Sequence, residues 1–166
     1  MFNKFILFFL LAALLISCAR NPVTGKRELS FMSEAQEKQM GAEYHPQILA
    51  EYGEYKDDKL QAFVDDKGQK MAAISHRPTL GFTFKVVDSP IVNAFAVPGG
   101  YVYFTRGIMA HFNNEAEFAG VLGHEIGHVT ARHANDMQRK QILTQLVLIG
   151  GMIASETFRQ FAEPAS

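Results

Sequence analysis

The amino-acid sequence predicts an α+β fold, mostly helical, with a small β-sheet or hairpin bordering one central helix. Apolar residues recur near helical spacing before residue 77 and after residue 113, whereas between residues 82 and 105 they form short β-prone runs separated by turn residues. A length of 166 residues, with 48% apolar and 20% charged residues, suits one globular domain with a substantial core.

The charge balance excludes one class of partner. Lys and Arg number 16 and Asp and Glu number 17, which gives a net charge of -1, and no long block of one sign occurs. A nucleic-acid-binding surface is strongly basic. We therefore expect no nucleic acid among the partners.

The N-terminus is predicted to be an export signal. Lys4 precedes an unbroken apolar run over residues 5–16, which is too short to span a bilayer. The segment LISC at 15–18 resembles a bacterial lipobox, in which the signal is removed and the cysteine carries lipid. We expect residues 1–17 to be a lipoprotein signal peptide and Cys18 to be the lipid-attachment residue. An ordinary signal peptide that leaves an unpaired thiol is the alternative.

The next residues predict where the protein resides and where its domain begins. Ala19 is not aspartate, so in a cell with two membranes the lipoprotein sorting pattern that this segment resembles favours the outer membrane. Residues 18–30 contain Pro22 and Gly25 and show no periodicity, which predicts a tether to a domain over residues 31–166. We therefore expect a lipid-anchored protein of the bacterial cell envelope, on the periplasmic face of the outer membrane.

Two scaffold helices are predicted at the start of the domain. Ser33 and Gln36 form a capping-box pattern that opens the first helix, and Pro46 is expected to bend or interrupt it. Arg77-Pro78 is expected to end the second helix. Apolar positions recur along that helix at Leu60, Phe63, Val64, Met71 and Ile74. Two histidines are expected on the surface, His45 and His76.

A change to period two predicts β-strands. Residues 82–87 alternate, with Phe82, Phe84 and Val86 on one face. Residues 92–97 and 101–105 are two further β-prone runs, and the turn residues between them predict a hairpin. Two interpretations remain open. The strands form only a sheet that packs on helices, or residues 92–96 form an edge strand beside a cleft, to which an extended peptide adds by main-chain hydrogen bonds.

One helix carries the motif that predicts chemistry. Residues 121–129 read VLGHEIGHV and contain the pattern HExxH. At about 100° per residue, His124 and His128 lie about 40° apart and one turn apart on a helix, so both imidazoles can reach one metal ion. Glu125 lies beside them, where its carboxylate can take a proton from a metal-bound water. We predict zinc ligation by His124 and His128, with Glu125 as the catalytic base.

The bounds of this helix can also be predicted. It is expected to start about ten residues before His124, at an N-cap formed by Asn113 or Asn114, and to continue to about Gly150. Three glycines form a stripe without side chains along this helix. Each lowers the stability of the helix by about 1 kcal/mol relative to alanine, which indicates that another backbone element or the substrate approaches closely there. A weak helix is the alternative. The stripe consists of Gly120, Gly123 and Gly127.

A catalytic zinc usually has three protein ligands, and the third is not found beside the motif. The metzincin extension needs histidine at 134, where the chain has Ala134. If the helix runs on, His133 lies opposite His124, because nine residues rotate about 900°. We therefore expect the third ligand to come from a later helix and not from His133. The glutamates downstream are Glu156 and Glu163.

Three stretches resemble a known family. They are NPVTGKRELS at 21–30, NAFAVPGGYVYFTRGIM at 93–109 and NNEAEFAGVLGHEIGHVTARHA at 113–134. They are similar to the gluzincin-type zinc metallopeptidases, which include the CAAX prenyl protease, membrane quality-control proteases and periplasmic lipoprotein proteases. The resemblance is strongest to the exported lipoprotein branch.

The resemblance implies a zincin-like fold and a particular site. It implies one Zn²⁺ per complete domain, held by His124 and His128, with Glu125 as general base. It places three residues beside the substrate cleft: Asn93, Ala94 and Phe95.

One family feature is missing. The family has a third ligand, a glutamate in a segment resembling ExxAD on a later helix, and nothing between His133 and Ser166 matches it. We therefore expect residues 31–166 to be the N-terminal part of a C-terminally truncated metallopeptidase domain. The apolar segment 142–153 would lead toward the missing helix. The 166-residue stretch alone is expected to be inactive or nearly so.

The predicted function is a zinc-dependent endopeptidase of the cell envelope that hydrolyses misfolded or misassembled envelope proteins. Its partners would be unfolded or extended protein and the membrane, through lipid on Cys18. The alternative is a non-catalytic, chaperone-like lipoprotein that binds unfolded outer-membrane clients. The missing ligand favours this alternative, whereas the intact Glu125 argues against it.

Overall fold

A computed structural model of the chain describes residues 18–20, 23, 27–29, 32–134, 137 and 144. The predicted signal peptide lies outside the described residues, as do Glu156, Glu163, nearly all of the apolar segment 142–153 and the side chain of Cys18. No helix in the described part of the chain is both long enough and apolar enough to cross a membrane.

A short antiparallel ladder occurs in the predicted tether. β1 (Cys18–Arg20) pairs with β2 (Arg27–Leu29). The lack of periodicity in this segment gave no indication of the pairing. Strands of three residues are too short to show an alternating pattern, whereas Pro22 and Gly25 between them are residue types that favour a reversal of chain direction.

The first helix, α2 (Glu34–Tyr52), begins with the predicted capping box. Ser33 Oγ accepts a hydrogen bond from the backbone N–H of Gln36, whose side chain accepts one from the N–H of Ser33. The helix continues through Pro46, so of the two expected effects, a bend or an interruption, the interruption does not occur. Proline removes one helical hydrogen bond, and contacts with the sheet from His45 before it and Tyr52 after it hold the helix on both sides of that gap.

The second helix, α3 (Asp58–Ala73), is capped by Asp57, whose carboxylate accepts from the N–H of Leu60 at 3.0 Å. It ends before the predicted stop at Arg77-Pro78. Ile74 is its C-cap and is 87% exposed, so its assignment as a core-facing helical position is wrong.

The sheet consists of β3 (Thr83–Val87), β4 (Ala94–Val97) and β5 (Tyr101–Thr105), in the order β3-β5-β4. β4 and β5 form the predicted antiparallel hairpin, and β3 pairs with β5 in parallel. Among the strands that the structure describes, β4 is therefore an edge strand. α4 (Arg106–Met109) follows β5 directly, with Thr105 as its N-cap.

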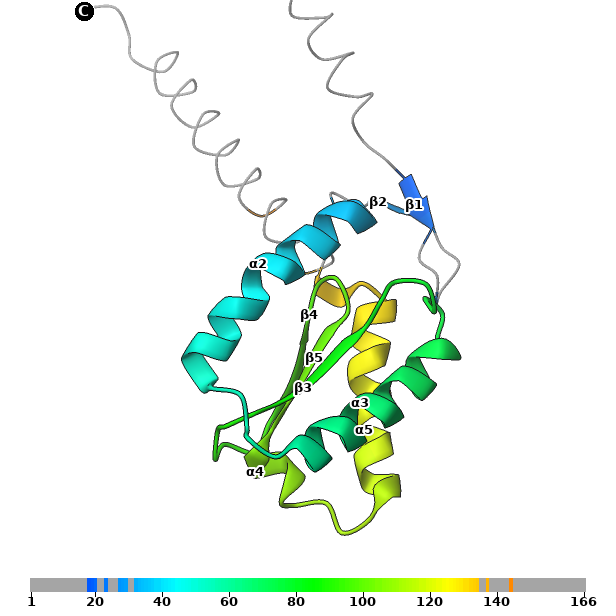
Figure 1. Cartoon of the computed structure of the whole chain (residues 1–166). Helices are drawn as coiled ribbons and strands as arrows, with labels where there is room; N and C mark the ends of the chain where they lie inside the picture. The colour runs from blue at the N-terminus through cyan, green and yellow to red at the C-terminus, as the bar shows by residue number, and fades with distance from the viewer. Residues whose placement is uncertain are drawn as a thin grey trace, which may run out of the picture.

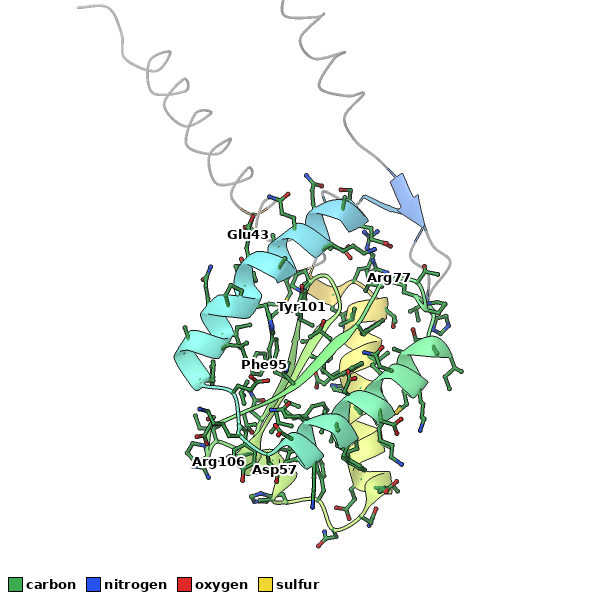
Figure 2. The ribbon with its side chains drawn as sticks, viewed as in Figure 1. Glu43, Asp57, Arg77, Phe95, Tyr101 and Arg106 are labelled. Carbon is green, nitrogen blue, oxygen red and sulfur yellow. The ribbon has the colours of Figure 1, made fainter. Side chains whose placement is uncertain are left out.

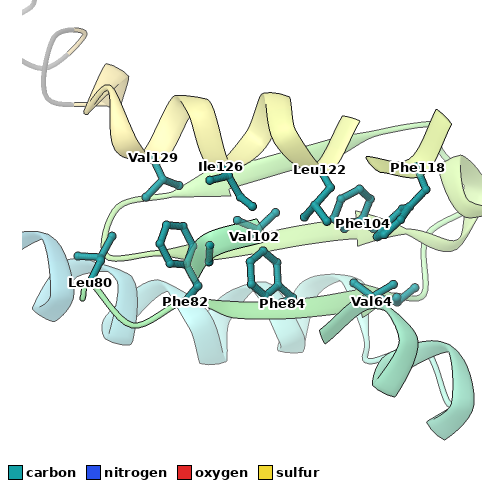
Figure 3. Close-up of a cluster of buried hydrophobic side chains, with 12 residues drawn as sticks. Val64, Leu80, Phe82, Phe84, Val102, Phe104, Phe118, Leu122, Ile126 and Val129 are labelled. Carbon is teal, nitrogen blue, oxygen red and sulfur yellow. The ribbon is translucent and has the colours of Figure 1, made fainter. Parts of the chain in front are cut away.

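The elements form three layers, with α2 on one face of the sheet and α3 and α5 (Glu115–Thr130) on the other (Figure 1). Apolar side chains of β3, β5, α3 and α5 fill the second interface (Figure 3). Full burial of a side chain the size of Leu122 contributes about 1.5–3 kcal/mol. This core holds the face of α5 that lies away from the motif histidines.

The turn between β4 and β5 packs directly against α2. Gly99 has φ 84°, and a Cβ there would lie 2.7 Å from the carbonyl oxygen of Glu37. A Cβ on Gly41 would lie 2.2 Å from the carbonyl oxygen of Pro98. Only glycine permits these approaches, and they fix the edge strand relative to the start of α2.

α2 also contacts the sheet through His45. Its Nδ1 lies 2.8 Å from the hydroxyl of Tyr103, a fully buried residue of β5. His45 is thus half-buried and not an ordinary surface histidine, which corrects the prediction. Its partner lies 58 residues away, so no local pattern could indicate the contact. His76 is exposed, as predicted.

α5 starts where the sequence predicts and ends earlier. Asn114 is the N-cap, and its Oδ1 accepts from the N–H groups of Ala116 and Glu117, both at 3.0 Å. The helix ends at Thr130, so the prediction that it continues unbroken to about Gly150 is wrong. Residues 133, 134, 137 and 144 are helical again beyond the break.

The break lies at Arg132, which has φ 58°, in the left-handed region. That conformation costs about 1–2 kcal/mol for a residue with a Cβ. The cost is offset because Nε and Nη2 of Arg132 both lie 2.5 Å from Oε1 of Glu37.

The glycine stripe of α5 does not serve the close approach of another protein segment among the described residues. A Cβ on Gly120 or Gly127 would meet nothing within 4 Å, and one on Gly123 would contact only the Cε of Met71 at 3.2 Å. Of the predicted roles, substrate approach and a weak helix remain.

Candidate metal site

The two motif histidines converge on one point. Nε2 of His124 lies 2.9 Å from Nε2 of His128, and the ring planes are at 88°. A zinc ion with tetrahedral Zn–N bonds of about 2.0–2.1 Å separates two such nitrogens by about 3.3 Å. A small opening of the pair therefore fits zinc, and neutral imidazole is a preferred donor for it. His124 is exposed and His128 is partly exposed, so solvent reaches both.

Glu125 is positioned differently. Its residue is 7% exposed, yet the structure gives its carboxylate no hydrogen bond or ion pair with any described residue. Every fully buried side-chain oxygen in the described part of the chain has a hydrogen-bond partner. Because the carboxylate oxygens of Glu125 have none, they are not fully buried and face the adjacent cavity. An unpaired carboxylate facing a cavity is what a proton acceptor requires.

The described residues supply two nitrogen ligands and no third. Within the described ranges, no group of three or more His, Cys, Asp or Glu residues is arranged to hold a metal ion. The residues present fit part of a catalytic zinc site, which needs three protein ligands and an open position.

A cavity of about 380 Å³ adjoins the histidines. Three elements form it: β4 with its following turn, the second half of α5 with the residues after it, and the first turns of α2. Its lining consists of Glu37, Ala94, Phe95, Ala96, Val97, Pro98, Gly99, His124, Glu125, His128, Val129, Arg132, His133, Ala134 and Met137.

Of the three predicted substrate-binding residues, Asn93 immediately precedes β4, and Ala94 and Phe95 are its first two residues. Ala94 and Phe95 line the cavity, whereas Asn93 does not. Asn93 faces β5, because its N–H donates to Thr105 Oγ1 and its carbonyl accepts from the N–H of Thr105. The Phe95 ring lies in the layer between α2 and the sheet (Figure 2). It stacks on the ring of Tyr103, with 5.0 Å between the ring centroids.

Alternation along β4 decides which main-chain groups face the open edge. Ala94 pairs with Phe104 and Phe95 with Tyr103. Since Asn93 directs its backbone groups toward β5, Phe95 does the same, and Ala94 and Ala96 direct theirs to the open edge. Both alanine methyls pack toward the core, so the small side chains let α5 lie close to this strand.

His133 is a site residue that the sequence does not reveal. Its Nδ1 lies 2.7 Å from Nδ1 of His128, so it lies beside the motif and not opposite His124. The predicted geometry assumed a continuous helix, and the break at Arg132 invalidates it. His133 is still not placed as a ligand, because it contacts the ring nitrogen of His128 that is remote from His124.

Glu37 is the second missed residue, and it connects three segments. It is 2% exposed and forms ion pairs with Arg132 at 2.5 Å and with Arg77 Nη2 at 2.8 Å. Arg77 in turn donates to the carbonyl of Val129 at the end of α5. A glutamate in the first turn of a helix reads as a dipole-stabilising surface residue, so the sequence carries no signal for its burial.

Two side chains in the layer between α2 and the sheet, His45 and Tyr103, have shifted pKa values. Burial lowers the pKa of His45, with a further contribution from the charge of Lys85. Burial raises the pKa of Tyr103 to about 12, and the neighbouring Tyr101 adds to this. Both shifts favour the neutral forms of these two side chains, which lie behind Phe95.

A helix with HExxH, packed on a small sheet whose edge strand borders the histidines, is typical of zinc-dependent peptidases. A model of peptidase family M48 matches residues 58–164. The chain belongs to peptidase family M48, which confirms the resemblance noted in the sequence.

Named relatives support the same assignment. The chain is 34% identical over 130 residues to the beta-barrel assembly-enhancing protease of Yersinia pestis, covering 78% of this chain and 27% of the relative. For the protein of that name in Escherichia coli K12 the identity is 30% over 136 residues, covering 80% and 28%. The mitochondrial metalloendopeptidase OMA1 of Arabidopsis thaliana is 42% identical over 80 residues, covering 46% and 16%. The chain thus spans less than a third of the length of each of these relatives.

Proposed function

We propose that the protein is a zinc-dependent endopeptidase of the bacterial cell envelope. One observation carries the proposal: the Nε2 atoms of His124 and His128 converge at a cavity that is also lined by Glu125, whose carboxylate has no partner among the described residues, and by the strand β4. Membership of peptidase family M48 supports it.

The residues of the site would divide the reaction between them. His124 and His128, as neutral imidazoles, would hold zinc together with a third ligand that the described residues do not contain. Zinc, when bound, supplies Lewis-acid activation of water and of the peptide carbonyl. Glu125 would accept a proton from the attacking water and deliver it to the leaving amine.

The edge of β4 would orient the substrate. The main-chain groups of Ala94 and Ala96 face outward, so an extended peptide can add to the sheet by hydrogen bonds that do not depend on its sequence. Recognition of this kind requires an unfolded or extended segment, since a folded strand has its backbone groups already paired.

The envelope setting rests on sequence features and relatives. Cys18 would carry the lipid that anchors the protein, and Ala19 favours the outer membrane. Two relatives are named for enhancing beta-barrel assembly. We therefore propose misfolded or misassembled envelope proteins as substrates.

The test compares Glu125→Gln with the wild type, in the complete protein as the cell makes it. The rate of cleavage of fluorescently labelled casein should fall at least about 100-fold, because general acid–base catalysis contributes a factor of about that size and glutamine cannot provide it. The zinc content per chain should stay the same. Glu115→Gln is the matched control, because Glu115 lies in the exposed first turn of the same helix.

Equal cleavage by the wild type and Glu125→Gln would overturn the proposal. Binding of unfolded protein without cleavage by either the wild type or Glu125→Gln would overturn it too, in favour of the chaperone-like alternative. Absence of zinc from both proteins would also overturn it.

A further inference from the structure

The ring of His128 has neighbours on both of its nitrogens. Its Nε2 lies 2.9 Å from Nε2 of His124, and its Nδ1 lies 2.7 Å from Nδ1 of His133. The rings of His128 and His133 are 4.8 Å apart between centroids and inclined at 69°. The ring of His128 therefore lies between the proposed zinc site on one side and His133 on the other.

The direction of the hydrogen bond between the two Nδ1 atoms follows from the role of His128. To bind a metal through Nε2, a neutral imidazole must have its lone pair there and its proton on Nδ1. That proton needs an acceptor, and Nδ1 of His133 is within hydrogen-bond distance. The opposite polarity would put a proton on Nε2 of His128 and block ligation.

The position of His133 is set by a contact far away in the sequence. Arg132 is held in the left-handed conformation by the buried carboxylate of Glu37, 95 residues earlier. This turn ends α5 and brings the next side chain back over His128. On a continuous helix, five residues rotate about 500°, which places His133 about 140° away from His128.

We propose that His133 is a positioning residue, which accepts a hydrogen bond from the Nδ1–H of His128 and so fixes the ring and tautomer that ligate zinc, and that the Glu37–Arg132 ion pair places it there. The inference deepens the proposed function and rests on it for the identity of the metal. Hydrogen bonds to the remote nitrogen of a metal-binding histidine orient the ring and raise its affinity for the metal.

The test uses two substitutions of His133 in the complete protein. His133→Leu removes the acceptor, whereas Oδ1 of the asparagine in His133→Asn is about as far from the backbone as Nδ1 of histidine and can accept the same proton. Zinc affinity, measured by competition with a chromophoric chelator, should fall at least about 10-fold in His133→Leu and recover to within about threefold of wild type in His133→Asn.

A second measurement needs no metal and no activity. Nitrogen-15 NMR of the metal-free protein reports which ring nitrogen of His128 carries the proton. The Nδ1–H tautomer should dominate in the wild type and His133→Asn and decline in His133→Leu. Since His133 is exposed, all three proteins should have the same circular dichroism spectrum.

Unchanged zinc affinity in His133→Leu, or an unchanged tautomer of His128, would overturn the inference. So would an affinity for zinc that stays low in His133→Asn. These outcomes are distinguishable from failure of the proposed function, which shows as casein cleavage that does not depend on Glu125, whatever the zinc affinities are.

Discussion

The two ends of α5 are held in opposite ways. At the N-terminal end, Asn114 caps the helix, and the carboxylate of Glu117 accepts hydrogen bonds from Asn113, all within four residues. At the C-terminal end, Arg132 depends on Glu37, 95 residues away. The first end can form by itself, whereas the second requires that α2 has docked. His133 is therefore brought onto His128 only when the domain is assembled, whereas His124 and His128 meet through the spacing of the helix alone.

The largest expected effect is at Glu37. Glu37→Ala leaves the guanidinium groups of Arg77 and Arg132 without their shared buried carboxylate, which should cost about 3 kcal/mol of the free energy of unfolding. Urea denaturation followed by circular dichroism measures it. Glu43→Ala, at an exposed position of the same helix, is the control. A loss no larger than that of the control would mean that the C-terminal end of α5 does not depend on α2.

Two substitutions of Arg132 distinguish the contribution of the ion pair to stability from that of the backbone conformation, and the expected difference is smaller. Arg132→Gly and Arg132→Ala both lose the contact with Glu37, but only glycine adopts φ 58° without strain. Arg132→Ala should therefore be less stable than Arg132→Gly by about 1 kcal/mol. The midpoints of urea denaturation give the difference. If alanine were the more stable of the two, the left-handed turn would not be a property of the folded state.

At the N-terminal end, Asn114→Ala should cost about 1 kcal/mol, the usual contribution of an N-cap. Asn114→Asp should retain the stability, because its carboxylate can accept the same two N–H groups. Thermal unfolding measures both. The two ends are independent if Asn114→Ala leaves the zinc affinity unchanged and Arg132→Ala lowers it, and a loss of zinc affinity in Asn114→Ala would break the comparison.

The smallest effect concerns pH and the docking of α2. Burial lowers the pKa of His45 in the folded state, so the unfolded chain binds more protons at this residue. Its contribution to stability is present above the unfolded pKa of about 6.5 and is lost as the pH falls below it. The stability of wild type should decline more between pH 7 and 5 than that of His45→Gln. Parallel pH profiles would show that His45 titrates alike in both states.

The same contrast explains what the sequence could predict. The capping box of α2, the N-cap of α5, the hairpin with its glycine turn, the alternating strand and HExxH depend on residues close together in the chain, and the structure contains each of them. The end of α5, the burial of Glu37 and the contact of His45 with Tyr103 depend on residues separated by 95 and 58 positions. No local pattern encodes such pairs, so the predicted continuous helix was wrong and His133 was misplaced with it.

The open edge of β4 also bears on solubility. Its four residues are about 13 Å long, and the adjoining Ile91 and Val92 are 64% and 52% exposed. Unpaired edges with apolar neighbours are where copies of a protein pair with one another, and a short edge limits that pairing. A longer β4 would pair more firmly with an added strand but would promote self-association, so the short length of this strand limits aggregation of the protein itself.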